Sequence, residues 1–267
     1  MILAPREPAE SVFRLETDQA IAQLTEFIQK EVKAAGRQRA VLGMSGGIDS
    51  ALVAHLATRA LGPANVVGIL LPFRTSSHES LLHAQMEIQK LGILHKTIEI
   101  TPIAEALFHQ IPSMDKRRMG NAMARLRMVV LYDQSEENDA LVIGTSNRTE
   151  TLLGYGTLHG DMAWGFNPIG CLYKTQVRQL AREIGVDPAI VGKTPTADLW
   201  AGQTDEGEIG VSYDVIDRVL YLMVDRGMSR ADVVALGYAP EAVDRVAGLV
   251  AGSEFKRRTP PVATVKP

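Results

Sequence analysis

Cysteine is almost absent from this sequence, because Cys171 is the only one among 267 residues. A single cysteine excludes a disulfide within the chain and a metal site built from cysteines alone. It also fits a reducing compartment. The first ten residues, MILAPREPAE, lack the charged leader and apolar core of a secretory signal. We therefore expect a cytoplasmic protein.

An excess of one charge and long apolar runs are lacking as well. The 28 Lys and Arg residues nearly balance 31 Asp and Glu residues, which gives a net charge of −3. No overall basic field favours nucleic acid or a membrane surface, so neither partner is expected and phosphate would need a local site. No run approaches the roughly 20 apolar residues of a membrane span. With 46% apolar residues, the chain can nevertheless bury a sizeable core.

Apolar segments of strand length alternate with helical patterns in the first part of the chain. Strands are predicted at 40–44, 66–72, 95–100 and 140–145, and helices near 18–35, 49–61, 78–91, 102–111 and 119–136. Mostly apolar strands separated by helices predict an α/β fold, a doubly wound parallel sheet flanked by helices on both faces. Ligands of such sheets bind where the strand order reverses. The ends of the first and fourth strands are therefore the expected site.

The strand signal fades after residue 170. The segment YKTQVRQLAREIG predicts a helix that ends at Gly185, and residues 212–252 predict two or three additional C-terminal helices. A polar stretch at about 193–210 lies between them and is predicted to be a flexible lid. We expect one domain over 1–267, with a tail from about 253 to 267.

The segment VLGMSGGIDS at 41–50 marks the change from a predicted strand to a predicted helix. Glycines let backbone N–H groups approach a phosphate, and the helix N-terminus adds a favourable partial charge. The structural alternative is a tight turn with Asp49 or Ser50 as the helix cap. No Lys follows the glycines as in a Walker A loop, and no GxGxxG follows a strand. A P-loop and a Rossmann dinucleotide site are therefore disfavoured.

Three further segments carry charged candidates. GTSNRTE at 144–150 ends the fourth predicted strand, so Glu150 would face Asp49 if the two strands are neighbours. Two carboxylates beside a polyphosphate suit Mg²⁺, which takes oxygen ligands from protein and phosphate together. Lys174 begins a predicted helix, where its charge opposes the helix dipole unless an anion binds nearby. Arg125 shares a helix face with Asn121 and would suit a nucleotide or a carboxylate. Solvated surface charges are the alternative for all three charged residues.

Six blocks in the same order and approximate spacing resemble the ammonia-dependent NAD synthetases, a branch of the ATP pyrophosphatases. The blocks are GMSGGIDSALVA, GNAMARLRM, GTSNRTE, NPIGCLYKTQVRQLA, KTPTADLWAGQTDEGEIG and FKRRTPP. The resemblance implies that ammonia amidates deamido-NAD (nicotinic acid adenine dinucleotide) to NAD through an adenylated carboxylate, with release of AMP and pyrophosphate. The SGGxDS loop alone is shared with ATP pyrophosphatases that adenylate other acceptors for amidation or thiolation, and such an enzyme is the alternative.

The resemblance also implies roles for single residues, with ATP as co-substrate and Mg²⁺ as cofactor. Asp49 and Lys174 would be catalytic, and Asp49 and Glu150 would bind the metal. The positions that resemble the ATP contacts of the family are Gly43, Met44, Ser45, Gly46, Gly47, Ile48, Asp49, Ser50, Thr145, Lys174 and Thr196. Those that resemble its deamido-NAD contacts are Arg125, Leu158, Gly165, Phe255 and Lys256.

The acceptor positions depart from the usual pattern of the family. Leu158 stands where a Lys is usual, Gly165 where an Asp is usual and Phe255 where a His is usual. We therefore expect a rearranged dinucleotide pocket, with the matching Asp161 nearby. The resemblance further implies a homodimer, whose interface the helices around 18–35 and 119–136 would supply. A glutaminase would need about another domain and a placed Cys nucleophile, so free ammonia is the expected donor, with a separate glutaminase partner left open.

Overall fold

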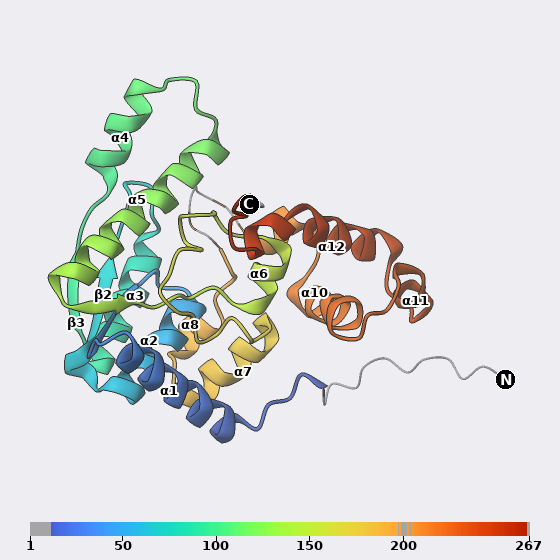
Figure 1. Ribbon diagram of the computed structural model, residues 1–267, viewed down its shortest axis with the longest axis horizontal. Coiled ribbons are helices and arrows are strands. Elements are labelled where there is room, and N and C mark those ends of the chain that lie inside the picture. Colours follow the sequence, from blue (N-terminus) through green and yellow to red (C-terminus); the bar gives the residue numbers. More distant parts are fainter. Residues whose placement is uncertain (1–11, 197, 199–201, 203, 266–267) are drawn as a thin grey trace.

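The computed structural model describes residues 12–196, 198, 202 and 204–265, and a parallel sheet lies at its centre (Figure 1). The strands in chain order are β1 (Arg39–Gly43), β2 (Val66–Leu70), β3 (Leu94–Thr97) and β4 (Ala140–Val142). They lie side by side in the order β3-β2-β1-β4, and every pairing is parallel. The predicted α/β fold is confirmed. Because β1 and β4 are neighbours, the strand order reverses between their carboxyl ends.

Helices cover both faces of the sheet, as predicted (Figure 1). One face packs against α1 (Thr17–Ala34), α2 (Ile48–Leu61), α3 (His78–Leu91), α7 (Lys174–Ile184) and α8 (Pro188–Val191). The other packs against α4 (Thr101–Gln110) and α5 (Lys116–Glu137). Strand side chains alternate between the two faces. Leu42 therefore packs on the α2 side and Val41 on the α5 side, which explains why residues 40–42 of β1 are all apolar.

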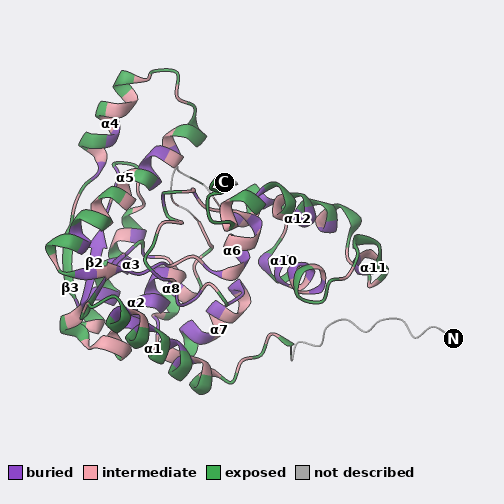
Figure 2. Cartoon of the chain, in the orientation of Figure 1, coloured by how far each residue is buried: buried purple, intermediate pink, exposed green. Residues whose placement is uncertain are grey.

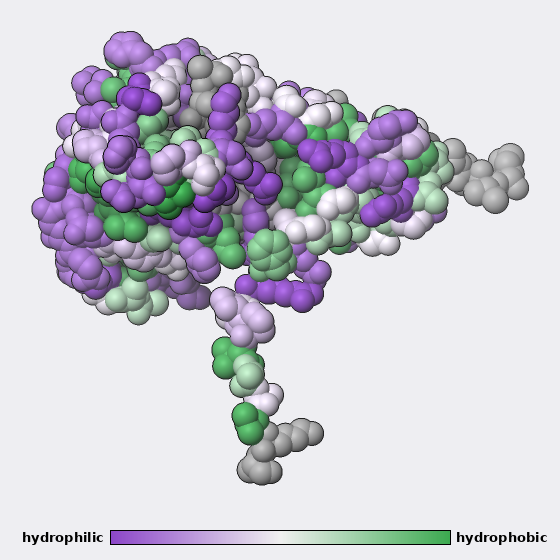
Figure 3. Space-filling view, turned by 90° about the horizontal axis from the view of Figure 1, so that it is seen from above, coloured by the Kyte–Doolittle hydropathy of each residue, from purple (hydrophilic) through white to green (hydrophobic). Residues whose placement is uncertain are grey.

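A second apolar core lies in the C-terminal part, around Tyr213 and Ile216 (Figure 2). The helical elements outside the two sheet layers are η2 (Pro63–Asn65), α6 (Arg148–Leu153), α9 (Asp205–Ile209), α10 (Tyr213–Leu220), the π-helical turn η3 (Tyr221–Asp225), α11 (Arg230–Ala235), α12 (Pro240–Gly252) and η4 (Glu254–Arg257). After η4 the chain projects from the body, with Val262 87% exposed (Figure 3). The helices predicted within 212–252 are therefore present.

Several boundaries differ from the predicted ones for local reasons. Helix α5 begins at Lys116, because the Asp115 carboxylate accepts a hydrogen bond from the Arg118 N–H at 2.8 Å and caps the helix. Helices α6 and α8 were not predicted. The predicted lid at 193–210 includes α9, which Thr204 caps, so that part of it is not irregular. Residues 197, 199–201 and 203 of the lid lie outside the described residues. None of the helices in the described part of the chain is both long and apolar enough to cross a membrane.

A buried hydrogen-bonded pair of side chains joins the helices on the α2 side of the sheet. The His55 ring of α2 lies 2.5 Å from the Glu87 carboxylate of α3, and the Asp187 N–H donates to the same carboxylate at 2.8 Å. Burial opposes ionisation of Glu87, but the hydrogen bonds from His55 and Asp187 outweigh it and lower the Glu87 pKa. Because the folded pKa is the lower one, the stabilisation is complete above the unfolded pKa of about 4.3. It is lost as the pH falls through the folded value.

Glu87→Gln is therefore expected to lower the free energy of unfolding at pH 7 by about 1–3 kcal/mol. The difference from the parent protein should shrink as the pH falls below about 4. Urea unfolding at pH 7 and at several acidic values measures it. Glu26→Gln, at an exposed position of α1, is the control. A Glu87→Gln difference that does not change with pH would contradict the role of the ionised carboxylate.

Candidate functional site

A cavity of about 700 Å³ opens at the carboxyl ends of the strands, where the strand order reverses. This volume lies within the range of ligand pockets in proteins. The residues that follow three of the strands line it, for example Met44 after β1, Leu71 after β2 and Thr145 after β4. Polar and charged groups then converge on an otherwise largely apolar floor. The site expected from the strand order is therefore a real cavity.

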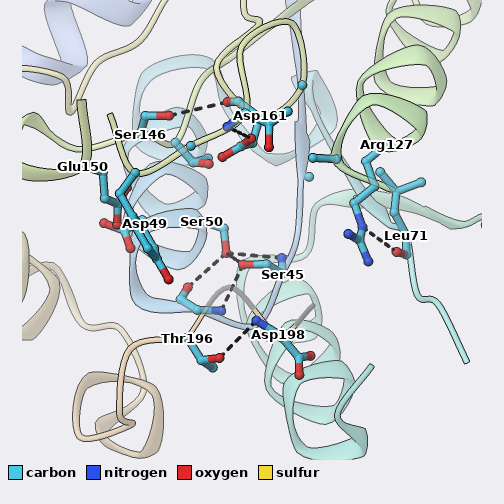
Figure 4. A pocket seen from close by; sticks show the side chains of 18 of the residues that line it. Ser45, Asp49, Ser50, Leu71, Arg127, Ser146, Glu150, Asp161, Thr196 and Asp198 are labelled. Atoms are coloured by element: carbon cyan, nitrogen blue, oxygen red, sulfur yellow. Dashed lines mark hydrogen bonds between the residues drawn. The ribbon is translucent and has the colours of Figure 1, made fainter. Parts of the chain in front are cut away.

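The loop from Ser45 to Ser50 forms one wall of this cavity (Figure 4). The Ser50 hydroxyl accepts from the Ser45 N–H at 3.3 Å and donates to the Gly47 carbonyl at 3.0 Å. The Ser45 hydroxyl accepts from the Gly47 N–H at 3.2 Å. Gly47 is the N-cap residue of α2, so the alternative with Asp49 or Ser50 as the cap is wrong. The N-terminus of α2 and its partial positive charge therefore lie at the cavity.

Gly46 belongs to this loop but does not line the cavity. Its φ is +74°, and a Cβ there would lie 1.9 Å from the Ser80 carbonyl oxygen of α3. Both facts require glycine. An L side chain is strained at that φ, and the Ser80 backbone cannot move far enough to make room for a Cβ. Gly46 therefore allows α3 to approach the predicted phosphate loop closely.

Gly46→Ala is expected to destabilise the protein by more than about 3 kcal/mol, since overpacking adds to the backbone strain. Gly36→Ala is the matched control, because Gly36 has φ +70° with nothing within 4 Å of the added Cβ. The control should lose only about 1–2 kcal/mol. Thermal or urea unfolding of both variants measures the difference. Equal losses would show that the contact with Ser80 is unimportant.

The central feature of the cavity is a buried lysine between two carboxylates. The Lys174 ammonium donates to Asp49 at 2.5 Å and to Glu150 at 3.0 Å, and the Lys174 side chain is only 2% exposed. Asp49 comes from the first turn of α2, Glu150 from α6 and Lys174 from the first turn of α7. The sequence predicted that the two carboxylates face each other. It did not predict that the ammonium joins them.

Asn147 fixes both carboxylates from the loop that follows β4. Its side-chain amide donates to Asp49 at 2.9 Å, and its side-chain oxygen accepts from the Glu150 N–H at 2.9 Å. Its own N–H donates to the Glu150 carboxylate at 3.3 Å, which completes a capping box at the start of α6. Asn147 was not predicted as a site residue. The N-x-x-E spacing within GTSNRTE was the signal that could have found it.

Burial and charge set the protonation of this cluster. Burial alone would lower the Lys174 pKa, but Asp49 and Glu150 raise it above its usual range, so the ammonium stays charged. Burial raises the Glu150 pKa; Lys174 opposes this effect and Asp49 adds to it. The cluster therefore holds one fixed cation beside two carboxylates.

A second layer of buried groups holds Lys174 in place. Asp217 of α10 accepts from the Thr149 hydroxyl at 2.6 Å and from the Thr175 N–H at 2.8 Å. The Thr149 hydroxyl in turn accepts from the Lys174 N–H at 2.9 Å. The Lys174 ammonium also lies 5.3 Å from the centre of the Tyr213 ring. The C-terminal helices therefore position the lysine, and no local pattern in the sequence predicts this network.

The cavity wall also holds most of the residues expected to contact an acceptor. Arg125 donates to the Leu158 carbonyl at 3.3 Å, and Lys256 donates to the Gly154 and Gly156 carbonyls at 2.8 and 2.7 Å. Phe255 and Leu158 also line the cavity. Gly165 does not, because it packs against β4, where an added Cβ would lie 2.7 Å from Leu141.

Asp161 and Thr196 also lie in the cavity wall. Asp161 accepts from the Thr157 N–H at 2.7 Å, and burial raises its pKa despite this hydrogen bond. The Thr196 hydroxyl accepts from the Asp198 N–H at 3.1 Å (Figure 4). Thr145 lines the wall after β4. Among the candidate residues, only Gly46 and Gly165 lie outside the cavity wall.

Comparison with known proteins places this cavity in a family context. Residues 20–260 match the family model described as NAD synthase. The chain is 52% identical over 242 residues to the NH(3)-dependent NAD(+) synthetase of Trichlorobacter lovleyi, which covers 91% of this chain and 89% of the relative. It is 48% identical to the enzyme of the same name from Chlorobium phaeobacteroides (strain DSM 266), over 91% of this chain and 87% of the relative.

Solved structures give the same result. An NMN synthetase from Francisella tularensis superimposes with a TM-score of 0.85 at 32% identity, over 94% of this chain and all of that one. An NH3-dependent NAD synthetase from Campylobacter jejuni gives a TM-score of 0.81 at 33% identity, with the same coverage. Family and fold therefore extend over the strands, the cavity and the C-terminal helices together.

Proposed function

Because the chain belongs to the NAD synthase family, we propose that it amidates deamido-NAD to NAD with ammonia and ATP, releasing AMP and pyrophosphate. The observation that carries the proposal is the buried Lys174 between Asp49 and Glu150, beside the N-terminus of α2 in a nucleotide-sized cavity. A fixed cation and oriented N–H groups are what a polyphosphate requires.

The chemistry needs activation of a carboxylate, since its carbonyl carbon is electron-rich and oxide is a poor leaving group. In the first step a carboxylate oxygen of the nicotinate attacks the α-phosphate of ATP, and pyrophosphate leaves. In the second step ammonia attacks the carbonyl carbon of the mixed anhydride, AMP leaves with the bridging oxygen, and a proton is lost from nitrogen. Negative charge grows on the pyrophosphate in the first step, so Lys174 and the N-terminus of α2 stabilise that transition state.

We further propose that Asp49 and Glu150 bind Mg²⁺. Two carboxylates from different elements are hard oxygen ligands, and each of their oxygens has a second lone pair besides the one that accepts from Lys174 or Asn147. The described residues contain no group of three or more His, Cys, Asp or Glu that could hold a metal alone. The donor set therefore fits a cation that takes its remaining ligands from phosphate and water. When bound, Mg²⁺ would neutralise phosphate charge.

Residues Ser45, Gly47, Ile48, Thr145 and Thr196 would contact ATP, since they line the same cavity as Asp49. Arg125, Phe255 and Lys256, which also line it, would contact the acceptor. Leu158 offers an apolar side chain there, which supports a rearranged acceptor pocket. Gly46 and Gly165 would not contact a substrate themselves. They would let the backbone pack closely against Ser80 and Leu141.

In the rearranged pocket proposed here, Leu158→Lys is expected to leave the KM for deamido-NAD unchanged. A pocket that is merely short of one contact would instead show a KM about tenfold lower, since a cation would then face an anionic substrate. The value of kcat should change little. Initial rates at varied deamido-NAD and saturating ATP measure both constants. Leu158→Met, which adds no charge, is the control. An unchanged KM would indicate that the pocket is rearranged rather than merely short of one contact.

We also propose a cytoplasmic homodimer in which α1 and α5 meet the partner subunit. Phe27 of α1 and Val129 and Tyr132 of α5 are large apolar residues that stay exposed in the single chain. Such residues are expected at the core of an interface. Sedimentation should give twice the mass of one chain, and Val129→Asp should reduce it to one.

The function itself is tested by supplying acceptors separately. With ATP, Mg²⁺ and ammonium, deamido-NAD should give NAD with the highest kcat/KM. Because a solved neighbour is an NMN synthetase, the deamido mononucleotide is the competing acceptor. A higher kcat/KM for the mononucleotide would overturn the acceptor assignment. Turnover of neither acceptor would favour the alternative, an ATP pyrophosphatase with a different acceptor.

A further inference from the structure

Arg127 of α5 reaches the cavity from the side opposite the carboxylates. In Figure 4 its guanidinium lies across the Ser45 loop from Asp49 and Glu150. Its Nε donates to the Leu71 carbonyl at 3.1 Å, directly after β2. This bond fixes the plane of the guanidinium and leaves its two terminal nitrogens free of the other residues that the structure describes.

The terminal nitrogens have no partner among the described residues. No described carboxylate forms an ion pair with Arg127, although many other arginines of the chain have one. The acids that act on it electrostatically are Asp198 and Asp161. Each of these uses a carboxylate oxygen elsewhere, Asp198 with the Ser77 N–H at 2.9 Å and Asp161 with the Thr157 N–H at 2.7 Å. Arg127 is therefore a positioned cation that forms no ion pair with a described carboxylate.

Burying a charged guanidinium that forms no ion pair is energetically unfavourable. Burial lowers the Arg127 pKa, while Asp198 and Asp161 oppose that effect. The group nevertheless stays protonated, because a guanidinium does not lose its proton in proteins. A desolvated charge without a partner is unfavourable unless something complements it. Since four of its five N–H groups point from a fixed fork, a ligand with paired acceptor oxygens would complement it best.

We propose that Arg127 binds a phosphate group of the nucleotide in the cavity through its two terminal nitrogens. The proposal rests on the proposed function, which supplies two phosphate sources, ATP and the dinucleotide acceptor. Arg127 and Lys174 then contact the bound anions from opposite walls. Lys174 is already paired with two carboxylates, whereas Arg127 brings a positive charge that forms no ion pair with a described residue. This makes Arg127 a binding residue that the motif comparison did not single out.

The test compares Arg127→Gln and Arg127→Lys with Arg118→Gln, an exposed position of the same helix outside the cavity. We expect Arg127→Gln to raise the KM of one phosphate substrate by 10- to 100-fold, as expected for the loss of one charge-assisted pair. Arg127→Lys should recover part of that loss, because it keeps the charge but not the fork. The substrate whose KM rises, ATP or deamido-NAD, identifies the source of the phosphate. Arg118→Gln should match the parent protein.

Calorimetric titration with ATP alone, and with deamido-NAD alone, separates this inference from the proposed function. If the parent protein binds either ligand but amidates no acceptor, the function fails while the Arg127 comparison still stands. Weaker binding of one ligand to Arg127→Gln, in a variant that unfolds at the same temperature, supports the inference. Binding of both ligands within twofold of the parent protein would overturn it. A lower unfolding temperature with unchanged affinities would likewise overturn it, because Arg127 would then only support the Leu71 backbone.

Discussion

Lys174→Gln is expected to lower kcat by about 10²–10³-fold, the loss that follows removal of one preorganised electrostatic stabiliser. It should also lower the free energy of unfolding by about 3 kcal/mol, because it leaves Asp49 and Glu150 without their shared cation. These side chains are 18% and 17% exposed, so the loss is at the low end for a buried pair. Initial rates of NAD formation and urea unfolding measure the two effects.

The double variant Lys174→Gln with Glu150→Gln separates the two roles of the lysine. Removing one of the two facing carboxylates should restore much of the stability, because less charge is left unpaired. Activity should stay low, since the cation that faces the phosphate is still missing and a proposed Mg²⁺ ligand is lost with Glu150. Turnover of folded Lys174→Gln within tenfold of the parent protein would contradict a role in stabilising the leaving group.

Asp49→Asn is expected to lower kcat by about 10²–10³-fold while the fold stays intact. Asparagine can still accept from Asn147, but its amide cannot accept from Lys174 and is a weak ligand for Mg²⁺. Asp214→Asn, also in the first turn of a helix and 74% exposed, is the matched control. The assay is repeated at rising Mg²⁺ concentration. Near-normal turnover at saturating Mg²⁺ would remove Asp49 from the metal site.

The sequence predicted the elements whose pattern is local. The apolar strands and the helix at Lys174–Ile184 follow from periodicity and from the glycine after it, since Gly185 has the left-handed conformation of a helix end. The predicted C-terminal ends of the strands lie up to three residues beyond the observed ones. Hydrophobicity continues past Val142 and Thr97, whereas the ladder of each strand stops there.

The candidate site likewise contains residues that the sequence predicts and residues that only the folded structure brings together. Asp49, Glu150 and Lys174 stand in motifs whose glycines, caps and strand ends can be seen in the sequence. That Lys174 joins the two acids depends on packing between residues 125 positions apart, which no local pattern reports. Asp217 and Arg127 are charged residues within helices, where a sequence pattern favours solvent. Only tertiary contacts show that one is buried and that the other faces the cavity.

The most direct test of the account follows the oxygen that the nicotinate carboxylate donates. Deamido-NAD labelled with ¹⁸O in that carboxylate is incubated with ATP, Mg²⁺ and ammonium, and the products are analysed by mass spectrometry. Attack on the α-phosphate predicts one ¹⁸O atom in each AMP, with pyrophosphate unlabelled and equal in amount to NAD. Release of ADP with label in inorganic phosphate would contradict adenylation and, with it, the role assigned to Lys174 and the α2 N-terminus.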